Sequence, residues 1–157
     1  MKKFAFINYF VAILAVALLA VSCSKDKDEV GGQDQLIGKW GLTYTQGYEK
    51  ENGEIYSEWD KEVSGWSESD SWYYEIEFKS NGTFEEYRSE DETPTTGTWV
   101  KSGSTLKKKY SGDEDDEIVE LKISKLTATE LIIITEESFV EDGDKFELYD
   151  KEEFKKI

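Results

Sequence analysis

Apolar and polar residues alternate in short runs along most of the chain. In "YEIEFK", Tyr74, Ile76 and Phe78 fall on one face and charged residues on the other, and "IVELKIS" repeats the alternation. A period of two is typical of a strand with one buried face. Further strands are expected at "GKWGLTYT", "EIYSEWD", "TGTWVKS", "STLKKKY", "ELIIIT" and "VEDGDKFELY". The pattern therefore predicts eight or nine short strands and an all-β fold.

Tight turns separate these runs. Asn81-Gly82 and Asp142-Gly143 are strong hairpin signals, because a type I′ turn needs positive φ at both central residues. Strands joined by tight turns pair antiparallel, since parallel pairs need long crossovers. We expect a meander closed into a barrel or folded into a sandwich. No internal helix is predicted, although the terminal "KEEFKKI" could form one or two helical turns.

A glycine, one residue and a large aromatic residue open three of the predicted strands. The three are Gly38-Lys39-Trp40, Gly82-Thr83-Phe84 and Gly97-Thr98-Trp99. We interpret each glycine as part of a turn and each aromatic side chain as part of the core.

The N-terminus has the layout of a secretory signal. Two lysines precede a mainly apolar stretch from Phe4 to Val21, and small residues lead to Cys23. "AVSC" resembles the lipobox of bacterial lipoproteins, in which the cysteine becomes the lipidated first residue. The sequence thus predicts a cleaved signal peptide over 1–22, a lipidated cysteine with a flexible acidic tether over 23–35, and one domain over 36–157. The alternatives are a plain membrane helix and a signal peptide with a leftover thiol.

The segment after the cysteine bears on location. "SKDKDE" resembles the acidic tether that exports lipoproteins to the cell surface in Bacteroidetes. We expect attachment to the bacterial outer membrane through the lipid, facing the cell surface or, alternatively, the periplasm.

Charge and composition exclude several functions. Residues 1–22 hold two lysines and no acids, so the mature chain carries 17 basic and 35 acidic residues, a net charge of −18. Such a field repels nucleic acid. The chain has no histidine, which excludes Ser-His and Cys-His catalysis and the usual zinc sites. No catalytic residue, metal or cofactor is predicted, and the acidic run at 112–117 is interpreted as a solvated turn rather than a calcium loop.

Four blocks resemble a known family. "LIGKWGLT", "FKSNGTFEEY", "TGTWVKSGSTL" and "KISKLTATELIIITEE" are similar to successive parts of the lipocalin-like domain of Bacteroidetes lipoproteins, over roughly residues 35 to 150. The resemblance implies an antiparallel up-and-down β-barrel of about eight strands, often with a small-molecule cavity. In lipocalins a late arginine covers the first-strand tryptophan. Here Arg88 is the only arginine, and the C-terminal segment offers lysines such as Lys145 and Lys151.

The connection from 46 to 72 is rich in aromatic residues among glycines, serines and acids. The resemblance implies that it crosses the open mouth of the barrel, with Tyr56, Trp59 and Trp66 at the ligand entrance and Tyr44 beneath them. These four residues are the predicted ligand-binding set. The alternative is an extra strand at "EIYSEWD" whose aromatic side chains fill the barrel.

Three classes of function compete on this basis. The first is a lipid-anchored lipoprotein that binds a small neutral or apolar molecule or a glycan at the barrel mouth. The alternative is a surface module with a structural or protein-partner role, a filled barrel and no small ligand; the sequence identifies no particular protein partner. The third hypothesis is a carboxylate-based hydrolase, for which the sequence contains no supporting motif.

The lipobox assignment can be tested at Cys23. Cys23→Ala removes the thiol that would carry the lipid, so the variant should lose both acylation and its membrane anchor while the fold persists. Metabolic labelling with a fatty-acid probe checks this, and continued labelling of the variant would contradict the lipoprotein assignment.

Overall fold

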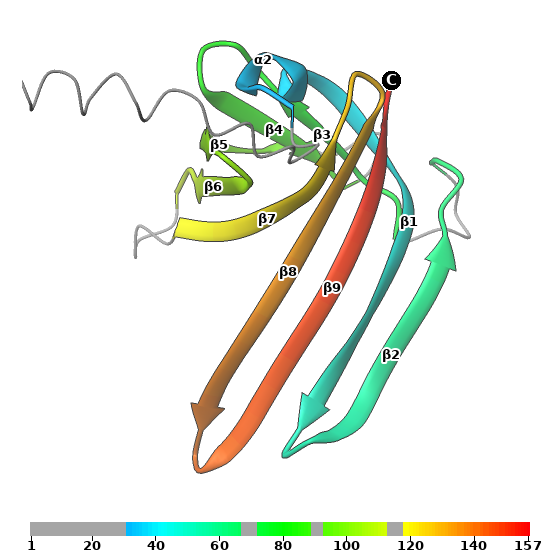
Figure 1. Ribbon diagram of the computed structural model, residues 1–157, viewed down its shortest axis with the longest axis vertical. Helices are drawn as coiled ribbons and strands as arrows, with labels where there is room; N and C mark the ends of the chain where they lie inside the picture. The colour runs from blue at the N-terminus through cyan, green and yellow to red at the C-terminus, as the bar shows by residue number, and fades with distance from the viewer. Residues whose placement is uncertain (1–30, 67–71, 89–92, 113–117) are drawn as a thin grey trace, which may run out of the picture.

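The computed structural model describes residues 31–66, 72–88, 93–112 and 118–157. In these ranges a single short helix is followed by nine antiparallel strands (Figure 1). The helix is α2 (Gln33–Leu36), and the strands are β1 (Gly38–Glu51), β2 (Glu54–Glu62), β3 (Glu75–Phe78), β4 (Thr83–Tyr87), β5 (Thr95–Ser102), β6 (Thr105–Tyr110), β7 (Ile118–Leu126), β8 (Glu130–Glu141) and β9 (Asp144–Lys156). The predicted all-β architecture is confirmed.

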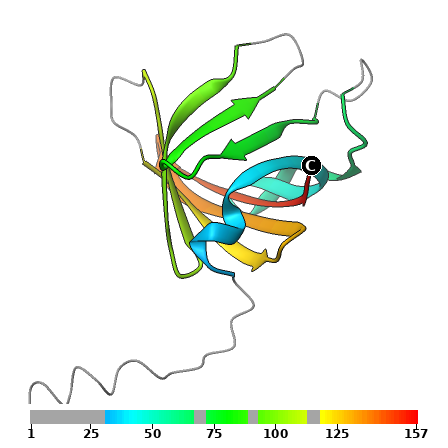
Figure 2. The same cartoon turned by 90° about the horizontal axis from the view of Figure 1, so that it is seen from above.

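Eight strands close into a barrel. From β3 to β9 each strand pairs with the next, β1 pairs with β3, and β1 also pairs with β9 to complete the ring. Viewed from above, the strands are arranged in a ring (Figure 2). The ninth strand, β2, pairs with β1 outside the ring. The predicted up-and-down barrel of about eight strands is therefore confirmed, and the sandwich alternative is wrong.

Four strands continue past the barrel as an open sheet. Residues 44–51 of β1 pair with β2 on one side and with β9 on the other, and β9 pairs with β8 along its whole length. In Figure 1 these four strands reach well beyond the short strands β3 to β7. We call this sheet, residues 44–62 and 135–151, the extension.

The core lies in the barrel at the end covered by α2. Its fully buried side chains include Trp40, Phe78, Phe84, Phe154, Leu36, Leu42, Leu106, Ile123, Leu126 and Leu131. The indole Nε1 of Trp40 donates a hydrogen bond of 2.8 Å to the carbonyl oxygen of Leu36, the last residue of α2. The helix thus closes this end of the barrel.

Lys156 covers Trp40. Its Nζ lies 5.0 Å from the centre of the Trp40 ring and donates to the carbonyl oxygen of Ile37 at 2.7 Å. The expected cation is therefore a lysine, but not one of the two named from the sequence, Lys145 and Lys151. The terminal "KEEFKKI" is strand rather than helix, because β9 must pair with both β1 and β8 to close the ring.

The glycine–aromatic motif is confirmed for its aromatic residues, since Trp40, Phe84 and Trp99 are all buried. The glycines serve two purposes. Gly38 and Gly82 have positive φ, as expected of chain reversals. At Gly97 φ is ordinary, but a Cβ would lie 2.2 Å from the Lys109 carbonyl oxygen, so glycine allows close packing there.

The hairpin signals give a mixed result. Asp142 and Gly143 both have positive φ and connect β8 to β9, as a type I′ turn requires. The hairpin at Asn81-Gly82 is confirmed, but only Gly82 has positive φ, so the predicted turn type is wrong. Asn52 and Gly53 both have positive φ between β1 and β2, a turn that the sequence analysis did not identify.

The N-terminal predictions fall largely outside the described residues. The signal peptide over 1–22 and Cys23 lie there, while the predicted tether over 23–35 overlaps α2 at its last three residues. Among the residues that the structure describes, no helix is long and apolar enough to span a membrane.

Trp40 offers a test of the closed end. Trp40→Ala would remove a fully buried side chain together with its hydrogen bond to Leu36. We expect the free energy of unfolding to fall by about 3–5 kcal/mol, as for other large core truncations. Chemical denaturation measures the change, with Tyr56→Ala, an exposed position, as the control. A change below 1 kcal/mol would contradict the packing described here.

Candidate functional site

Polar side chains line the inner wall of the barrel at the end away from α2. Successive inward residues of β9 are Phe154, Glu152 and Asp150, which pair on the β1 side with Leu42, Thr45 and Gly47. The inner face of β4 changes in the same way from Phe84 to Glu86. The alternation that builds an apolar core near α2 therefore brings carboxylates into the opposite end.

Glu86 and Lys108 form a buried ion pair within this wall. Their side chains are 4% and 8% exposed, and the ammonium contacts Oε1 of the carboxylate. The hydroxyl of Tyr110 donates to Glu86 Oε2 at 3.1 Å, and burial raises the pKa of this tyrosine. A paired and hydrogen-bonded charge is the form in which ionised groups tolerate an apolar interior.

Glu152 and Tyr74 form a second polar group nearer the opening. The Tyr74 hydroxyl donates to Glu152 Oε1 at 2.7 Å. Burial raises the pKa of Glu152 to about 7; the neighbouring Asp150 also raises it, while the hydrogen bond from Tyr74 opposes the shift. The Arg88 guanidinium lies 4.3 Å from the Tyr74 ring centre. Glu152 therefore changes charge near neutral pH.

Asp150 marks the border between barrel and extension. Its Oδ1 accepts hydrogen bonds from Thr45 Oγ1 at 3.1 Å and from Trp59 Nε1 at 3.2 Å. Burial raises the pKa of Asp150, and these two hydrogen bonds act against the shift. The Trp59 ring lies 6.0 Å from that of Trp72, which is 41% exposed.

These groups surround a cleft of about 290 Å³ at the open end. Its lining residues are Leu42, Thr45, Trp72, Tyr74, Arg88, Asp150 and Glu152. The two carboxyl groups can accept hydrogen bonds or pair with a cation, and the indole of Trp72 can stack on a ligand. In the part of the chain that is described, no cluster of three or more acidic or cysteine side chains could hold a metal ion.

The structure does not gather the four predicted ligand-binding residues at one place. Tyr44 is bonded to Asp60 through its hydroxyl, at 3.0 Å, and borders a different hollow from the cleft. Tyr56 is 59% exposed on β2. Trp59 approaches the cleft through its hydrogen bond to Asp150.

Trp66 lies against the barrel wall instead of across its mouth. Its ring is 4.7 Å from Tyr73 in an edge-to-face arrangement, and its Nε1 donates to Glu75 Oε1 at 3.1 Å. The Tyr73 hydroxyl in turn lies over Gly41 of β1. Trp66 is therefore not at the ligand entrance predicted for it, whereas Trp72, at the end of the same connection, lines the cleft.

The alternative prediction for this connection, an extra strand that fills the barrel, is confirmed only for the strand. The strand at "EIYSEWD" exists as β2, but Ile55 and Tyr56 are exposed instead of filling the barrel.

Most residues of the cleft were not predicted from the sequence. Asp150, Glu152 and Arg88 read as ordinary surface charges in an acidic chain. The one available signal was spacing, since Glu152 stands two residues before the apolar Phe154 and therefore shares its face.

The raised pKa of Glu152 predicts that the stability of the fold decreases as pH rises toward neutral. A carboxyl group whose pKa is higher in the folded state than its ordinary 4.5 stays protonated in the fold while the unfolded chain ionises. Its contribution to stability is full below about pH 4.5 and is lost as pH rises through about 7. Stability relative to Glu152→Gln should fall over that range, by roughly 3 kcal/mol at most. Urea unfolding of both proteins from pH 4 to 8 measures it, and a constant difference would contradict the assignment.

Comparison with known proteins places the chain in a family. The lipocalin-like domain family matches residues 36–133. Among solved structures, a lipocalin-like protein from Bacteroides uniformis is 17% identical with a TM-score of 0.48, over 78% of this chain and 99% of that one. A search of curated proteins found no match. On the strength of the family match over most of the barrel, the chain belongs to the lipocalin-like domain family.

Proposed function

We propose that this protein is a lipid-anchored lipoprotein of the bacterial outer membrane whose barrel mouth binds a small neutral or cationic molecule. One observation carries the proposal. The open end of the barrel holds a cleft with two inward carboxyl groups, Asp150 and Glu152, beside the exposed indole of Trp72. Membership of the lipocalin-like family is consistent with a barrel that binds a ligand.

The size of the cleft limits the ligand. About 290 Å³ is at the lower end of the usual range for ligand pockets, and the barrel beyond it is filled by core side chains such as Phe84 and Phe154. A sterol or a long acyl chain would have to displace that core. The expectation of an apolar ligand is therefore narrowed to a small polar one, including a single sugar ring.

The charge of the cleft sets the preference between ions. Two carboxyl groups face one guanidinium, that of Arg88, and the whole chain is strongly acidic. Anionic ligands are disfavoured by this field, whereas an ammonium group could pair with Asp150 or Glu152. Lys61 Nζ already lies 4.5 Å from the Trp72 ring centre, so a ligand cation that stacks on Trp72 would share or displace that contact. Each carboxyl group already accepts hydrogen bonds from the barrel wall, which suits a binding surface better than a pair of catalytic groups.

The position of the N-terminus is compatible with an anchor. Residue 31 donates its backbone N–H to Leu126 beside α2, at the closed end of the barrel. A lipid on Cys23 would therefore attach the protein through the closed end and leave the cleft accessible to solutes. Either face of the outer membrane satisfies this arrangement.

The experiment is a fluorescence and calorimetric titration of the protein in mild detergent. The probes are choline and spermidine as cations, glucose and N-acetylglucosamine as neutral sugars, and acetate as an anion. We expect one of the cations or sugars to bind and acetate not to bind. Trp72→Ala and Glu152→Gln should each weaken binding about tenfold, with Tyr56→Ala as a matched control. Cation affinity should rise as pH passes through about 7, because Glu152 then ionises.

Two results would contradict the proposal. One is the absence of binding by every probe at millimolar concentration. The other is binding that both cleft variants retain at the affinity of the parent protein, which would locate the ligand elsewhere.

A further inference from the structure

Each outer strand of the extension, β2 and the part of β8 after Ile134, has a described partner on one edge only. β2 pairs with β1 through residues Glu54 to Glu62, and no described segment pairs with its other edge. An edge strand presents backbone N–H and C=O groups that can pair with another extended chain. We propose that β2 is a docking edge for a basic, extended segment of a partner protein, which adds to the sheet as a further strand.

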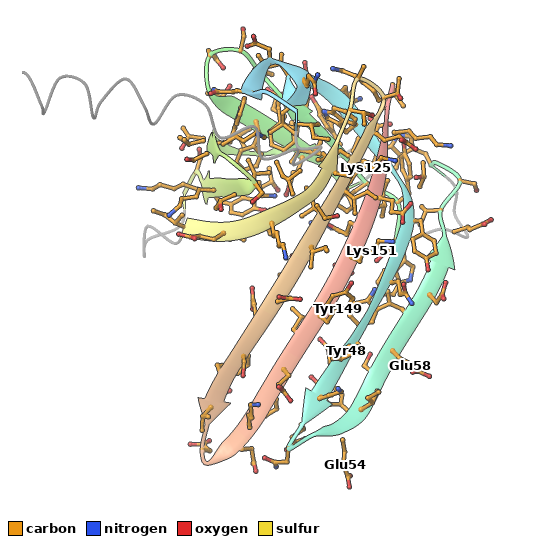
Figure 3. The ribbon with its side chains drawn as sticks, viewed as in Figure 1. Tyr48, Glu54, Glu58, Lys125, Tyr149 and Lys151 are labelled. Atoms are coloured by element: carbon orange, nitrogen blue, oxygen red, sulfur yellow. The ribbon has the colours of Figure 1, made fainter. Side chains whose placement is uncertain are left out.

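A hollow over β9, β1 and β2 borders this edge from the face of the sheet. It has a volume of about 630 Å³ and is lined by Gln46, Gly47, Tyr48, Ile55, Glu58, Trp59, Asp60 and Tyr149. Tyr48 and Tyr149 face each other across β1 and β9 with ring centres 5.6 Å apart and an interplanar angle of 21°. Figure 3 shows these two tyrosines and Glu58 on neighbouring strands of the extension.

The chemistry of the hollow suits a cation. Aromatic rings attract ammonium and guanidinium groups, and carboxylates pair with them. Lys50 of the protein already takes one such position, with its Nζ 4.3 Å from the Tyr48 ring centre, which leaves the Glu58 carboxylate for a cation of the partner. An added strand would lie next to β2, so a lysine or arginine side chain on its matching face would reach Glu58, the β2 partner of Tyr48, and pair with it.

The charge of the extension indicates a foreign partner and not a second copy. Residues 44–62 and 135–151 hold 13 acidic and four basic side chains. Two copies that paired through β2 would bring like charges together, which is destabilising across strands. A basic segment would instead be attracted to this surface and associate faster at low salt.

The edge is held in place before a partner arrives. The tips of the two hairpins are bonded to each other: Asn52 N donates to the Lys145 carbonyl oxygen at 2.7 Å, and its side chain bonds to Asp144 and to the Lys145 amide. Trp59 in β2 donates from its Nε1 to Thr45 of β1 and to Asp150 of β9, and so fixes the position of β2 against both strands. Preorganisation of this kind lowers the entropy cost of binding.

Apolar side chains near the tips add to the surface. Ile55 and Tyr56 on β2 are 52% and 59% exposed. Specific interfaces combine an apolar centre with a polar rim, and the acids of the extension supply the rim. The extension also points away from α2 (Figure 1), which leaves its edge accessible in an anchored protein.

The test uses the full-length protein and synthetic ten-residue peptides that alternate lysine with valine. A peptide with glutamate in place of lysine is the charge control, and a version with N-methylated backbone amides is the strand-pairing control. Hydrogen exchange locates the contact, and fluorescence anisotropy measures the affinity. We expect the lysine peptide to bind and to slow amide exchange in β2, while both control peptides bind at least tenfold more weakly.

Matched variants separate the two edges of the extension. Glu54→Lys/Glu58→Lys on β2 should weaken binding at least tenfold, whereas Glu136→Lys/Glu141→Lys on β8, with the same change in net charge, should weaken it less than threefold. Three results would overturn the proposal. The first is an equal loss of affinity in both variants, and the second is binding of the N-methylated peptide as tight as that of the lysine peptide. The third is amide exchange in β2 that the lysine peptide does not slow. Choline and sugar binding at the barrel mouth should be unaffected by the β2 variant, so the two sites can fail independently.

Discussion

The structure depends on how β1 divides its hydrogen bonds. One edge pairs with β9 from Trp40 to Glu51, while the other edge pairs first with β3 at residues 38–41 and then with β2 at residues 44–51. A register shift between Leu42 and Tyr44 separates the two parts. Over the first part the sheet closes into a barrel, and over the second it opens into the extension. If β1 formed only the hydrogen bonds of the barrel, it would end near Thr45. The cleft and the docking edge would then both be absent.

The same strands carry a change in chemistry along the barrel axis. Near α2 the inward positions are large and apolar, and Trp40 and Phe78 leave no space for a ligand. Further along, inward positions become Glu152, Glu86 and Lys108, each of which is paired or hydrogen-bonded. Among the described residues no buried side-chain polar atom lacks a partner. Burial of these polar groups costs desolvation free energy, which ion pairs and hydrogen bonds offset. The raised pKa of Glu152 shows that this offset is incomplete for its ionised form.

The two proposed sites use different parts of this arrangement. The cleft relies on side chains that point into the barrel, so its ligand must be small. The β2 edge relies on backbone groups and on the outer face of the extension, so its partner must be an extended chain. Trp59 connects them, because it belongs to β2 and donates to Asp150 at the rim of the cleft. Both sites lie away from residue 31, the side on which a lipid anchor would act.

The sequence by itself determined the strands, most hairpins and the aromatic core, because alternation and turn chemistry are local properties that need no partner to be read. "YEIEFK" therefore predicted Tyr74, Ile76 and Phe78 correctly as inward residues. Asn52-Gly53 carried an equally local signal, but the aromatic residues around it suggested a loop. Only the tertiary structure decided that the C-terminal segment is a strand, since this depends on ring closure between β9 and β1. It also decided which of many carboxylates face inward, and that Trp66 packs outside the barrel. These outcomes depend on pairing between segments that are far apart in the sequence, and a local residue pattern does not identify the segment with which it pairs.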